Sequence, residues 1–345
     1  MAARIGLVGC GTVGTGLIEL LALKSGHLLE KYGVEFKIIF VTDAVKGTVF
    51  SDSGLDPAEI SGELERRRDL SESPHAREGL GSLPDLIKSA KLDMLCEATP
   101  TNYKTGEPGM TILRSALSSG VSAVTSSKGA LGLDMAGLKK LASDNGAMLR
   151  FESSVMSGTP LISLVRGPLA GCEVSRVEGI LNGTTNYILT EMGEGASYGD
   201  ALASAQRLGY AEADPSGDVE GFDAAVKVCI MSAEFFGVPL AMGDVRRTGI
   251  TGVTEGDVKR AAESGGRIKL IAGVERDGGS AKGYVAPRVL GSGNPLASIS
   301  GATNAVSVTT DNLGTITISG PGAGKRETAQ GLMADMIEIA MACGK

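Results

Sequence analysis

The stretch ARIGLVGCGTVGTGLIELLAL, residues 3–23, decides the fold class of this chain. It runs from an apolar segment through a glycine-rich turn into leucines with helical spacing. Gly9, Gly11 and Gly14 have the G-x-G-x-x-G spacing that permits a tight turn, close approach of a pyrophosphate, and packing of the helix on the strand. We predict a strand, a phosphate-binding turn and a helix whose N-terminus stabilises phosphate charge. The predicted cofactor-binding residues of this turn are Gly9, Gly11, Thr12, Val13 and Gly14.

Strand-like and helix-like segments alternate after this turn, which is typical of βαβ units with a parallel sheet. The predicted strands are residues 34–43, 92–101 and 121–128, followed by a strand-like segment at 149–155. The predicted helices are residues 84–90, 109–120 and 135–149. We therefore expect an α/β protein with an N-terminal Rossmann dinucleotide-binding domain.

The pattern changes near residue 155 and indicates a second domain with a mixed or antiparallel sheet. Its predicted strands are residues 175–183, 268–276, 281–290 and the alternating stretch 304–320, with a long helix at 219–237. An amphipathic helix at 328–342 closes the chain. We place residues 1–135 and the C-terminal segment 322–345 in the dinucleotide-binding domain, and residues 136–321 in an α+β domain.

Composition excludes several classes of protein. The chain has 345 residues, enough for two domains, and a formal net charge of −7. It has no Trp and 4% aromatic residues, which argues against binding nucleic acid. The sequence lacks the run of roughly 20 apolar residues that a membrane span needs and begins without a secretory pattern, so we expect a cytoplasmic protein. The five cysteines form no CxxC pair and signal neither a disulfide framework nor a zinc site.

Asp43 ends the second predicted strand and is the candidate for binding the ribose of the cofactor. Its separation from Gly14 exceeds the roughly 20 residues that are usual, and an extended first helix accounts for the difference. A carboxylate there favours NAD over NADP because it repels a 2′-phosphate, although the nearby Lys46 weakens this preference. Near the other end, GPGAGKRE (320–327) has P-loop-like glycines, but Arg326 stands where Ser or Thr must bind magnesium. We interpret it as a glycine-rich turn near the cofactor.

Two lysines are candidates for chemistry. Lys128 follows a predicted parallel strand, at the edge of the sheet where α/β proteins bind ligands, and is otherwise an ordinary surface lysine. Asp223 and Lys227 stand at i and i+4 on one helix face, either as an exposed ion pair or with the lysine bordering the core. Burial there would lower the pKa of the lysine towards the range useful for acid–base catalysis. Neither His27 nor His75 is well placed for that role.

The stretches GILNGTTNYILTEM (179–192) and AQRLGYAEADPSGDVEGFDAAVK (205–227) resemble the signature of the homoserine dehydrogenase family. CEATPTNYKTGEPG, VTSSKGAL and FESSVMSGTPLI also resemble blocks of this family, so the likeness covers nearly the whole chain. The resemblance implies interconversion of L-homoserine and L-aspartate 4-semialdehyde with NAD or NADP, on the route to threonine, methionine and isoleucine. It also implies a homodimer built on the second domain, which would be both catalytic and dimerising.

The resemblance assigns roles to residues of this sequence. Lys227 would be the acid/base, Lys128 would lie at the reacting carbon, and Asp223 would orient the lysine. The implied substrate-binding residues are Glu212, Asp218, Gly183, Thr184 and Tyr210. Thr99, Lys128 and Gly322 would touch the cofactor. The implied ligands of a sodium ion are Glu152, Val155, Ser157 and Thr159.

This sequence departs from the family pattern at two positions, and two other functions remain to be weighed. Ser127 stands where the family usually has Asn, and Ser157 where alanine or glycine is frequent. The chain ends soon after its last helix, so we expect a short form without a C-terminal regulatory domain. An aspartate-semialdehyde dehydrogenase would need a cysteine nucleophile paired with a histidine. A nicotinamide-sensing protein without catalysis would have no use for Lys128 and Lys227 together.

Overall fold

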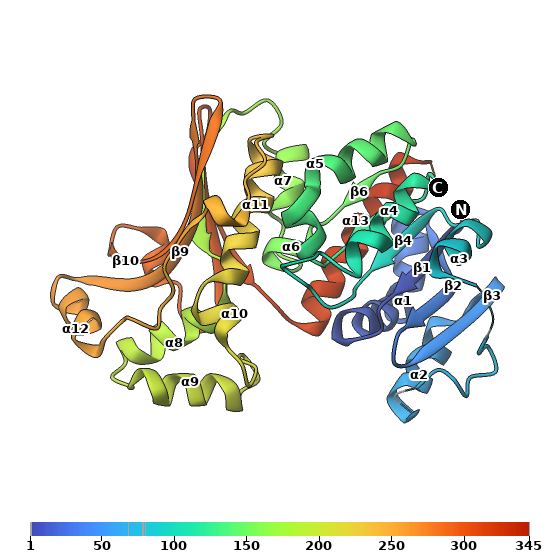
Figure 1. The fold of residues 1–345 in the computed structure, drawn as a ribbon, viewed down its shortest axis with the longest axis horizontal. Helices are drawn as coiled ribbons and strands as arrows, with labels where there is room; N and C mark the ends of the chain where they lie inside the picture. The colour runs from blue at the N-terminus through green and yellow to red at the C-terminus, as the bar shows by residue number, and fades with distance from the viewer. Residues whose placement is uncertain (1, 68, 78, 80, 345) are drawn as a thin grey trace. The chain divides into compact units, whose positions relative to one another are not determined.

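Residues 2–67, 69–77, 79 and 81–344, which the computed structural model describes, divide into two units by their internal contacts (Figure 1). The first unit contains the chain up to Gly158 and again from Gly324 onwards, and the second contains Thr159–Ala323. The C-terminal helix therefore belongs to the same unit as the N-terminal glycine-rich turn. Each unit has its own six-stranded sheet within these residues.

The sheet of the first unit has the strand order β3-β2-β1-β4-β5-β6. Its strands are β1 (Ala2–Val8), β2 (Glu35–Asp43), β3 (Gly47–Leu55), β4 (Met94–Glu97), β5 (Ser122–Thr125) and β6 (Leu149–Arg150). Neighbouring strands are parallel except for β3, which pairs antiparallel with β2 at the edge. This arrangement confirms the predicted Rossmann-type fold, whereas β3 was not predicted because its serines and glycines give a weak strand pattern.

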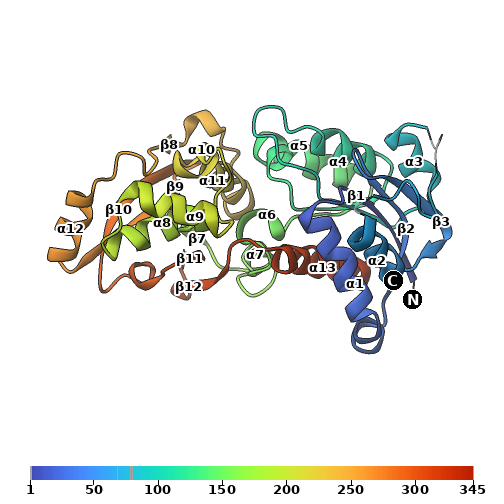
Figure 2. The ribbon, with the colours of Figure 1, turned by 90° about the horizontal axis from the view of Figure 1, so that it is seen from below.

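Helices cover both faces of this sheet (Figure 2). The helices of the first unit are α1 (Thr12–Tyr32), α2 (Pro57–Arg67), α3 (Leu83–Ser89), α4 (Gly109–Ser118), α5 (Gly129–Asp144), α6 (Ser153–Met156) and α13 (Lys325–Ala342). On one face α1 packs against α13 and α2, and on the other α4 packs against α3 and α5. The main hydrophobic core lies between the sheet, α1 and α13. The C-terminal helix thus completes the fold of the first unit.

The segment 149–155, which the sequence favours as a strand, is a strand only at Leu149–Arg150 and continues into α6. The strand stops because the backbone amide of Glu152 donates to the carboxylate of Asp335 on α13, at 2.7 Å, rather than to a neighbouring strand. Within the described residues no helix is long and apolar enough to cross a membrane.

The sheet of the second unit is mixed, with strand order β12-β11-β7-β9-β10-β8. Its strands are β7 (Val174–Ile180), β8 (Arg246–Arg247), β9 (Gly266–Asp277), β10 (Ser280–Gly291), β11 (Thr303–Thr310) and β12 (Gly314–Pro321). All its pairings are antiparallel except that of β8 with β10. The long β9–β10 hairpin is conspicuous in Figure 1. The predicted mixed sheet is confirmed.

The helices of the second unit are α7 (Ile162–Arg166), α8 (Gly183–Gly193), α9 (Tyr198–Arg207), α10 (Ser216–Val219), α11 (Phe222–Phe235) and α12 (Glu255–Glu263), with 3-10 turns η1 (Met242–Asp244) and η2 (Pro295–Ser298). Helix α11 packs on β9 and β10, and α8 on β9 and β11. The predicted helix at 219–237 is wrong at its start, because Gly221 has φ +82° and separates α10 from α11. The left-handed conformation at Gly221 redirects the chain so that Asp218 and Asp223 come from different helices.

Candidate active site

The glycine-rich turn joins β1 to α1 and has room for a ligand. Gly9 has φ +93°, and a Cβ there would lie 2.5 Å from the carbonyl oxygen of Ala98. A Cβ on Gly14 would lie 2.0 Å from the carbonyl oxygen of Gly9. A Cβ on Gly11, in contrast, would meet no protein atom within 4 Å. The fold itself therefore requires Gly9 and Gly14, whereas Gly11 leaves open space at the N-terminus of α1, where Thr12 begins the first turn.

A groove of about 620 Å³ lies beside this turn. It is lined by Gly11, Thr12, Thr15, Glu19, Lys46, Leu64, Glu65 and Lys325. Lys325, the first residue of α13, forms an ion pair with Glu19 at 2.5 Å, and its carbonyl oxygen would lie 2.6 Å from a Cβ on Gly16. The GPGAGKRE segment thus ends against α1. This supports its interpretation as a turn near the predicted cofactor site.

Asp43, at the end of β2, is tied to the glycine-rich turn. One oxygen of its carboxylate accepts from the backbone amide of Cys10 at 2.7 Å, and the other accepts from the amides of Val45 and Lys46. Partial burial would raise the pKa of Asp43, but these backbone hydrogen bonds and the charge of Lys46 lower it overall. The Lys46 ammonium donates to the carbonyl oxygen of Cys10. Asp43 is therefore ionised at neutral pH, with a cation close by.

Thr99 and Lys128 lie after two adjacent parallel strands of the first unit. Glu97 of β4 and Thr125 of β5 are register partners, so the two strands end side by side. Thr99 lies two residues after the end of β4, and half-buried Lys128 is the N-cap residue of α5. The backbone amide of Lys128 donates to the hydroxyl of Thr101 at 3.3 Å. The structure thus brings Thr99 and Lys128 to the same edge of the sheet, the ligand edge of open α/β folds.

Lys227 in the second unit is buried and paired. Only 5% of its surface is exposed, and its ammonium lies 2.8 Å from the carboxylate of Asp223 and 2.6 Å from the carbonyl oxygen of Leu181. The alternative of a solvent-exposed ion pair is therefore wrong. The pair is buried because α11 is apolar over a wide arc and packs on β9 and β10. Both hydrogen-bond partners stabilise the ammonium form of the lysine.

Asn182, which sequence reasoning missed, holds this cluster together. Its side-chain amide donates to Asp218 at 2.6 Å and to Asp223 at 3.1 Å. Its carbonyl oxygen accepts from the backbone amide of Thr185 at 2.9 Å and caps α8. The signal in the sequence was Asn directly before a helix, the residue type favoured at an N-cap.

The carboxyl group of Asp218 has a perturbed pKa. Burial raises it above its ordinary value, and the nearby negative charge of Asp223 raises it further. Hydrogen bonds from Asn182 and Thr184 and the charge of Lys227 act in the opposite direction. Such a group among polar partners is typical of a functional site.

The other predicted substrate-binding residues surround the N-terminus of α8. The hydroxyl of Thr184 donates to the carbonyl oxygen of Tyr210 at 2.6 Å, and the ring of Tyr210 lies 5.1 Å from that of Tyr187. A Cβ on Gly183 would lie 2.7 Å from the carbonyl oxygen of Ala302, so the helix begins close to that loop. The side chain of Glu212 is exposed, and only its backbone carbonyl oxygen accepts a hydrogen bond in the described part of the chain. The structure thus joins Thr184 to Tyr210 and leaves Glu212 on the surface.

The remaining predicted residues lie near the points where the chain passes between the units. Gly322 packs so closely on Asn304 that a Cβ would lie 2.1 Å from its side chain. Glu152, Val155, Ser157 and Thr159 are all buried. The hydroxyl of Ser157 lies 2.9 Å from that of Thr328, and the hydroxyl of Thr159 donates to the carbonyl oxygen of Pro321 at 3.0 Å. The described residues contain no group of three or more His, Cys, Asp or Glu side chains arranged to hold a metal ion.

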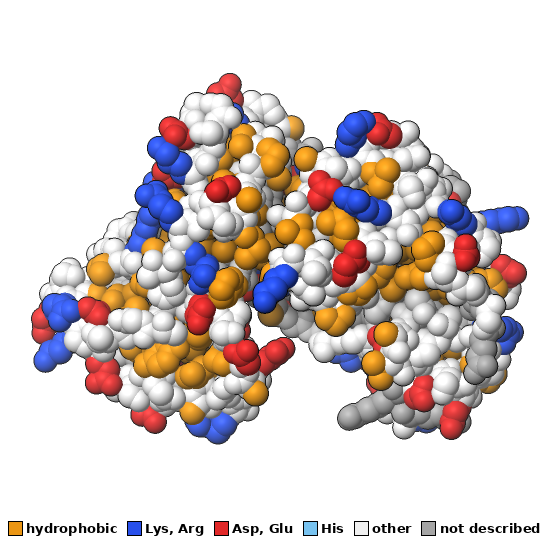
Figure 3. Space-filling model, in the orientation of Figure 1, with side chains coloured by type: hydrophobic (Ala, Val, Ile, Leu, Met, Phe, Trp, Pro, Cys, Tyr) orange, Lys and Arg blue, Asp and Glu red, His pale blue; other side chains and the backbone are white. Residues whose placement is uncertain are grey.

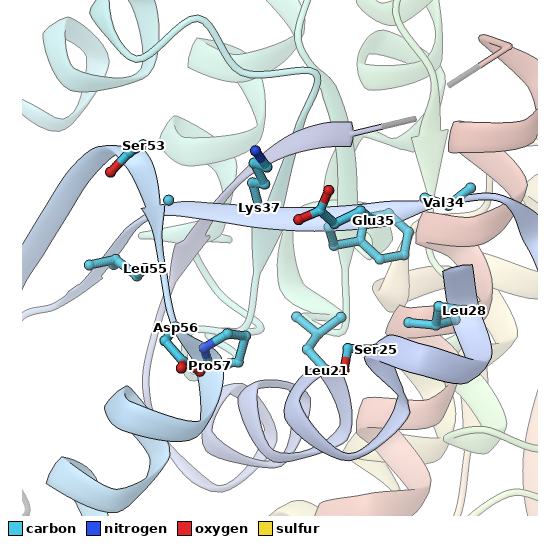
Figure 4. Close-up of a pocket in the computed structure, with 12 residues that line it drawn as sticks. Leu21, Ser25, Leu28, Val34, Glu35, Lys37, Ser53, Leu55, Asp56 and Pro57 are labelled. Carbon is cyan, nitrogen blue, oxygen red and sulfur yellow. The ribbon is translucent and has the colours of Figure 1, made fainter. Parts of the chain in front are cut away.

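Two further pockets contain none of the predicted site residues. The first, of about 340 Å³, lies at the amino-terminal ends of β2 and α2 and beside α1 (Figure 4). Leu21, Leu28 and Leu55 form its apolar wall, and it faces away from the strand ends that carry Thr99 and Lys128. The second, of about 810 Å³, lies between α12 and the β9–β10 hairpin.

A Rossmann-type unit with an open glycine-rich turn, and a second unit with a buried lysine–carboxylate cluster, define the class of protein as an oxidoreductase with a dinucleotide-binding domain. Residues 160–337 match the model of the family described as homoserine dehydrogenase. The NAD(+)-dependent homoserine dehydrogenase of Pseudomonas canavaninivorans is 41% identical over 97% of this chain and 96% of its own length. The chain belongs to the homoserine dehydrogenase family.

Solved structures agree with this assignment. A putative homoserine dehydrogenase from Archaeoglobus fulgidus has a TM-score of 0.87 and 40% identity, covering 98% of this chain and 99% of its own. A hyperthermophilic archaeal homoserine dehydrogenase in complex with NADPH has a TM-score of 0.86 and 33% identity, covering 99% of this chain and 98% of its own. The similarity extends over both units of the chain.

Proposed function

We propose that this homoserine dehydrogenase interconverts L-homoserine and L-aspartate 4-semialdehyde with a nicotinamide cofactor, in the route to threonine, methionine and isoleucine, and that Lys227 is its acid/base. The observation that carries this proposal is the buried cluster of Lys227, Asp223, Asp218 and Asn182. The bound nicotinamide would accept the hydride from homoserine or return it to the aldehyde. The chain's own residues must then bind the amino acid and move one proton.

The pairing of Lys227 determines its resting state. Because the Asp223 carboxylate and the Leu181 carbonyl oxygen stabilise the ammonium, the resting lysine is an acid. In aldehyde reduction its Nζ would donate a proton to the carbonyl oxygen. In homoserine oxidation Nζ must lose a proton first and then accept the one from the substrate hydroxyl. Homoserine oxidation should therefore accelerate with rising pH more than aldehyde reduction does.

The same cluster suits an amino-acid substrate. The carboxyl groups of Asp218 and Asp223 both accept hydrogen bonds from the side-chain amide of Asn182, and exposed Glu212 lies on the loop before them. We propose that Glu212 and Asp218 bind the substrate ammonium group, with Gly183, Thr184 and Tyr210 lining the pocket. In the Glu212→Ala variant the KM for homoserine should rise with little change in kcat, and an unchanged KM would place the amine elsewhere.

We propose that the open space at Gly11 receives the pyrophosphate of NAD or NADP, because a Cβ there would meet no protein atom within 4 Å and the space lies at the N-terminus of α1. Thr12, Val13 and the N-terminus of α1 would bind the phosphates, and Asp43 the adenosine ribose. Ionised Asp43 favours NAD, while Lys46 reduces the discrimination. Asp43→Asn should lower the ratio of kcat/KM for NAD to that for NADP, and an unchanged ratio would contradict this role. Thr99, Lys128 and Gly322 would contact the cofactor near its nicotinamide.

The decisive measurement is the oxidation of L-homoserine with NAD or with NADP, followed by the absorbance of the reduced cofactor. Activity with NAD above that with NADP supports the proposal, and absence of activity with both rejects it. Lys227→Ala should lose about 100- to 10,000-fold in kcat and still bind NAD. Lys140→Ala is a matched control, because Lys140 forms an exposed i,i+4 pair with Asp144 at 2.7 Å. Near-normal turnover in Lys227→Ala would remove Lys227 from the mechanism.

We further propose that sodium binds the carboxylate of Glu152 and the backbone carbonyl oxygens of Val155, Ser157 and Thr159. These are hard oxygen donors, with one carboxylate for a monovalent cation. Replacing sodium with choline in the buffer should lower the melting temperature, and replacing it in the Glu152→Gln variant should not.

The proposed assembly is a homodimer in the cytoplasm, with no nucleic-acid or membrane partner. Edge strand β12 carries half-buried Ile316 and Ile318 on one face, which a second copy would cover. Acidic and basic side chains alternate over the face of each unit drawn in Figure 3, unlike a nucleic-acid-binding surface. All five cysteines are free, as in proteins of reducing compartments. Light scattering at several concentrations tests the dimer, which a monomer mass at all of them would contradict.

A further inference from the structure

A buried carboxyl group at the end of β4, that of Glu97, is not among the residues assigned above. Its side chain is fully buried. Oε1 accepts from the backbone amide of Thr99 at 2.8 Å and from the Thr99 hydroxyl, and Oε2 accepts from the hydroxyl of Thr125. Burial raises the pKa of Glu97, and these hydrogen bonds oppose the rise. Burying such a group is costly, so its hydrogen bonds must hold both strand ends in one arrangement.

The hydrogen bonds continue from Glu97 to the backbone beside Lys128. The hydroxyl of Thr125 donates to Glu97 and accepts from the backbone amide of Ser127 at 3.0 Å. Lys128, the next residue, donates its own amide to Thr101, two residues after Thr99. The backbone amide of Ser126 also donates to the carbonyl oxygen of Glu97 at 3.2 Å, so the segments 97–101 and 125–128 are linked in three places. Glu97 touches Thr99 directly and is connected through the Thr125 hydroxyl to the backbone amide of Ser127, the residue before Lys128.

The N-termini of α4 and α5 border this network, and the second is tightly packed. A Cβ on Gly109, the first residue of α4, would lie 3.5 Å from Oε2 of Glu97 and 3.4 Å from the hydroxyl of Ser127. A Cβ on Gly129, the first residue of α5, would lie 2.3 Å from the carbonyl oxygen of Asn102. The N-terminus of α4 therefore lies next to the carboxyl group, where its dipole favours negative charge. The two segments have little freedom to shift unless Glu97 changes.

We propose that Glu97 is a positioning residue of the reaction: through Thr99 and Thr125 it fixes the two strand ends that carry Thr99 and Lys128. This inference rests on the proposed function, which assigns Thr99 and Lys128 to the nicotinamide end of the cofactor. Glu97 itself touches neither substrate nor cofactor. Its removal should therefore lower kcat more than it weakens cofactor binding. Ala98 packs against Gly9, but in the described part of the chain the Glu97 carboxyl group bonds to Thr99 and Thr125 and not to the N-terminus of α1, where we propose that the phosphates bind.

The first test is Glu97→Gln, which keeps the shape of the side chain. If the NH2 group of the new glutamine faces Thr125, the hydroxyl proton of Thr125 loses its acceptor. If it faces Thr99, the NH2 group and the backbone N–H of Thr99 are two donors that point at each other. The strand ends must then shift. We expect kcat to fall roughly 10- to 100-fold, as for displacements of about 1 Å, while the Kd for NAD, measured by calorimetry, changes less than about threefold.

The second test separates positioning from stability. Thr125→Val removes the hydroxyl between Glu97 and Ser127 and should reproduce the loss of kcat, whereas Thr125→Ser keeps the hydroxyl and should restore it. The control is Asp93→Asn, at the opposite end of the same strand, where the carboxylate accepts from the backbone amide of Arg4 at 2.8 Å. It should change the melting temperature but not kcat. If Glu97→Gln does not fold, the comparison of Thr125→Val with Thr125→Ser still tests the positioning role of Glu97.

The outcomes distinguish this inference from the proposed function. The activity of Lys128→Ala is measured in the same experiment. If Lys128→Ala is inactive but Glu97→Gln and Thr125→Val both have a normal kcat, the positioning role of Glu97 is overturned and the proposed function stands. Full activity of Lys128→Ala rejects the role of Lys128 itself. A loss of kcat in Thr125→Ser as large as in Thr125→Val also overturns the proposal. The combined Glu97→Gln/Thr125→Val variant should lose less than the product of the two single effects, because both break the same connection.

Discussion

Replacing Asn182 with Asp tests the structure of the second-unit cluster. The substitution keeps an oxygen to cap α8, since Asp and Asn are equally good N-cap residues. It replaces the amide that donates to Asp218 and Asp223 with a third carboxylate. Two unit charges 4 Å apart repel by about 4 kcal/mol at an effective dielectric constant of 20. The cluster should avoid this cost by binding one proton.

Uptake of that proton sets how strongly Asn182→Asp lowers the free energy of unfolding. Protonating a carboxyl group of ordinary pKa near 4 costs about 1.4 kcal/mol per pH unit, hence about 4 kcal/mol at pH 7 and about 1.4 kcal/mol at pH 5. The sign follows from linkage. The pKa of Asp218 is already raised in the folded state, so its stabilising contribution is complete below the unfolded pKa and is lost as the pH rises through the folded pKa. Asn182→Asp should steepen this loss.

Urea unfolding of the wild type and of Asn182→Asp at pH 5, 6 and 7 measures the effect. Asn145→Asp is the control, because Asn145 is exposed and its amide donates to the carbonyl oxygen of Leu141 at 2.8 Å. The control should show a small destabilisation with no pH dependence. A destabilisation by Asn182→Asp that is equal at pH 5 and pH 7 would refute the bridging role of Asn182.

Substitutions at three other positions, Lys269, Ser157 and Gly11, test individual features. Burial lowers the pKa of Lys269 to about 8, so between pH 8 and pH 10 only the unfolded chain holds the proton and the wild type gains stability as the pH rises. Lys269→Met should therefore lose stability relative to the wild type over this range, by at most about 1.4 kcal/mol per pH unit. Urea titrations in which the free energies of unfolding of the two proteins change in parallel with pH would contradict this. Ser157 has φ +57°, so Ser157→Gly should be about 1 kcal/mol more stable than Ser157→Ala, since both lose the bond to Thr328 and only glycine relieves the strain; equal melting temperatures would exclude strain. Gly11→Ala should lose at most about 1 kcal/mol of stability, because Ala is a poorer N-cap than Gly, and should bind NAD at least tenfold more weakly. Gly26→Ala, inside α1, should gain about 1 kcal/mol and bind normally, and tight binding by Gly11→Ala would place the pyrophosphate elsewhere.

Much of the fold was predictable because local patterns agree with the tertiary structure. The glycine spacing at residues 9–14 predicted the turn between β1 and α1, and the helix ends at Tyr32 as the position of Asp43 required. The start of α11 was not predictable from helical periodicity, because only the left-handed conformation of Gly221 breaks the pattern. β3 was missed because it is an edge strand with few β-branched residues, held by its pairing with β2.

The candidate site was predictable to a different extent. The i,i+4 spacing of Asp223 and Lys227 predicted that they share a helix face but left their burial open, because burial depends on what packs against α11. The structure shows a buried pair and thereby excludes the surface interpretation. For Glu212 the sequence suggested a place in the same acidic group, yet its side chain is exposed.

The two residues that sequence reasoning missed share a physical cause. Asn182 bonds to carboxylates 36 and 41 positions away, and Glu97 bonds to a hydroxyl 28 positions away. Residue type and spacing identify groups able to move a proton or bind phosphate, because those properties belong to the side chain itself. A residue that positions such groups is defined by partners that only the fold brings near. In both units a buried polar side chain lies between the ends of separate elements, and its unsatisfied form would be costly in the core. Because an unpaired polar group is costly in the core, Asn182 and Glu97 keep their hydrogen-bond partners in fixed positions. The tests at Asn182 and Glu97 therefore both ask whether a buried hydrogen-bonding side chain positions the groups around it.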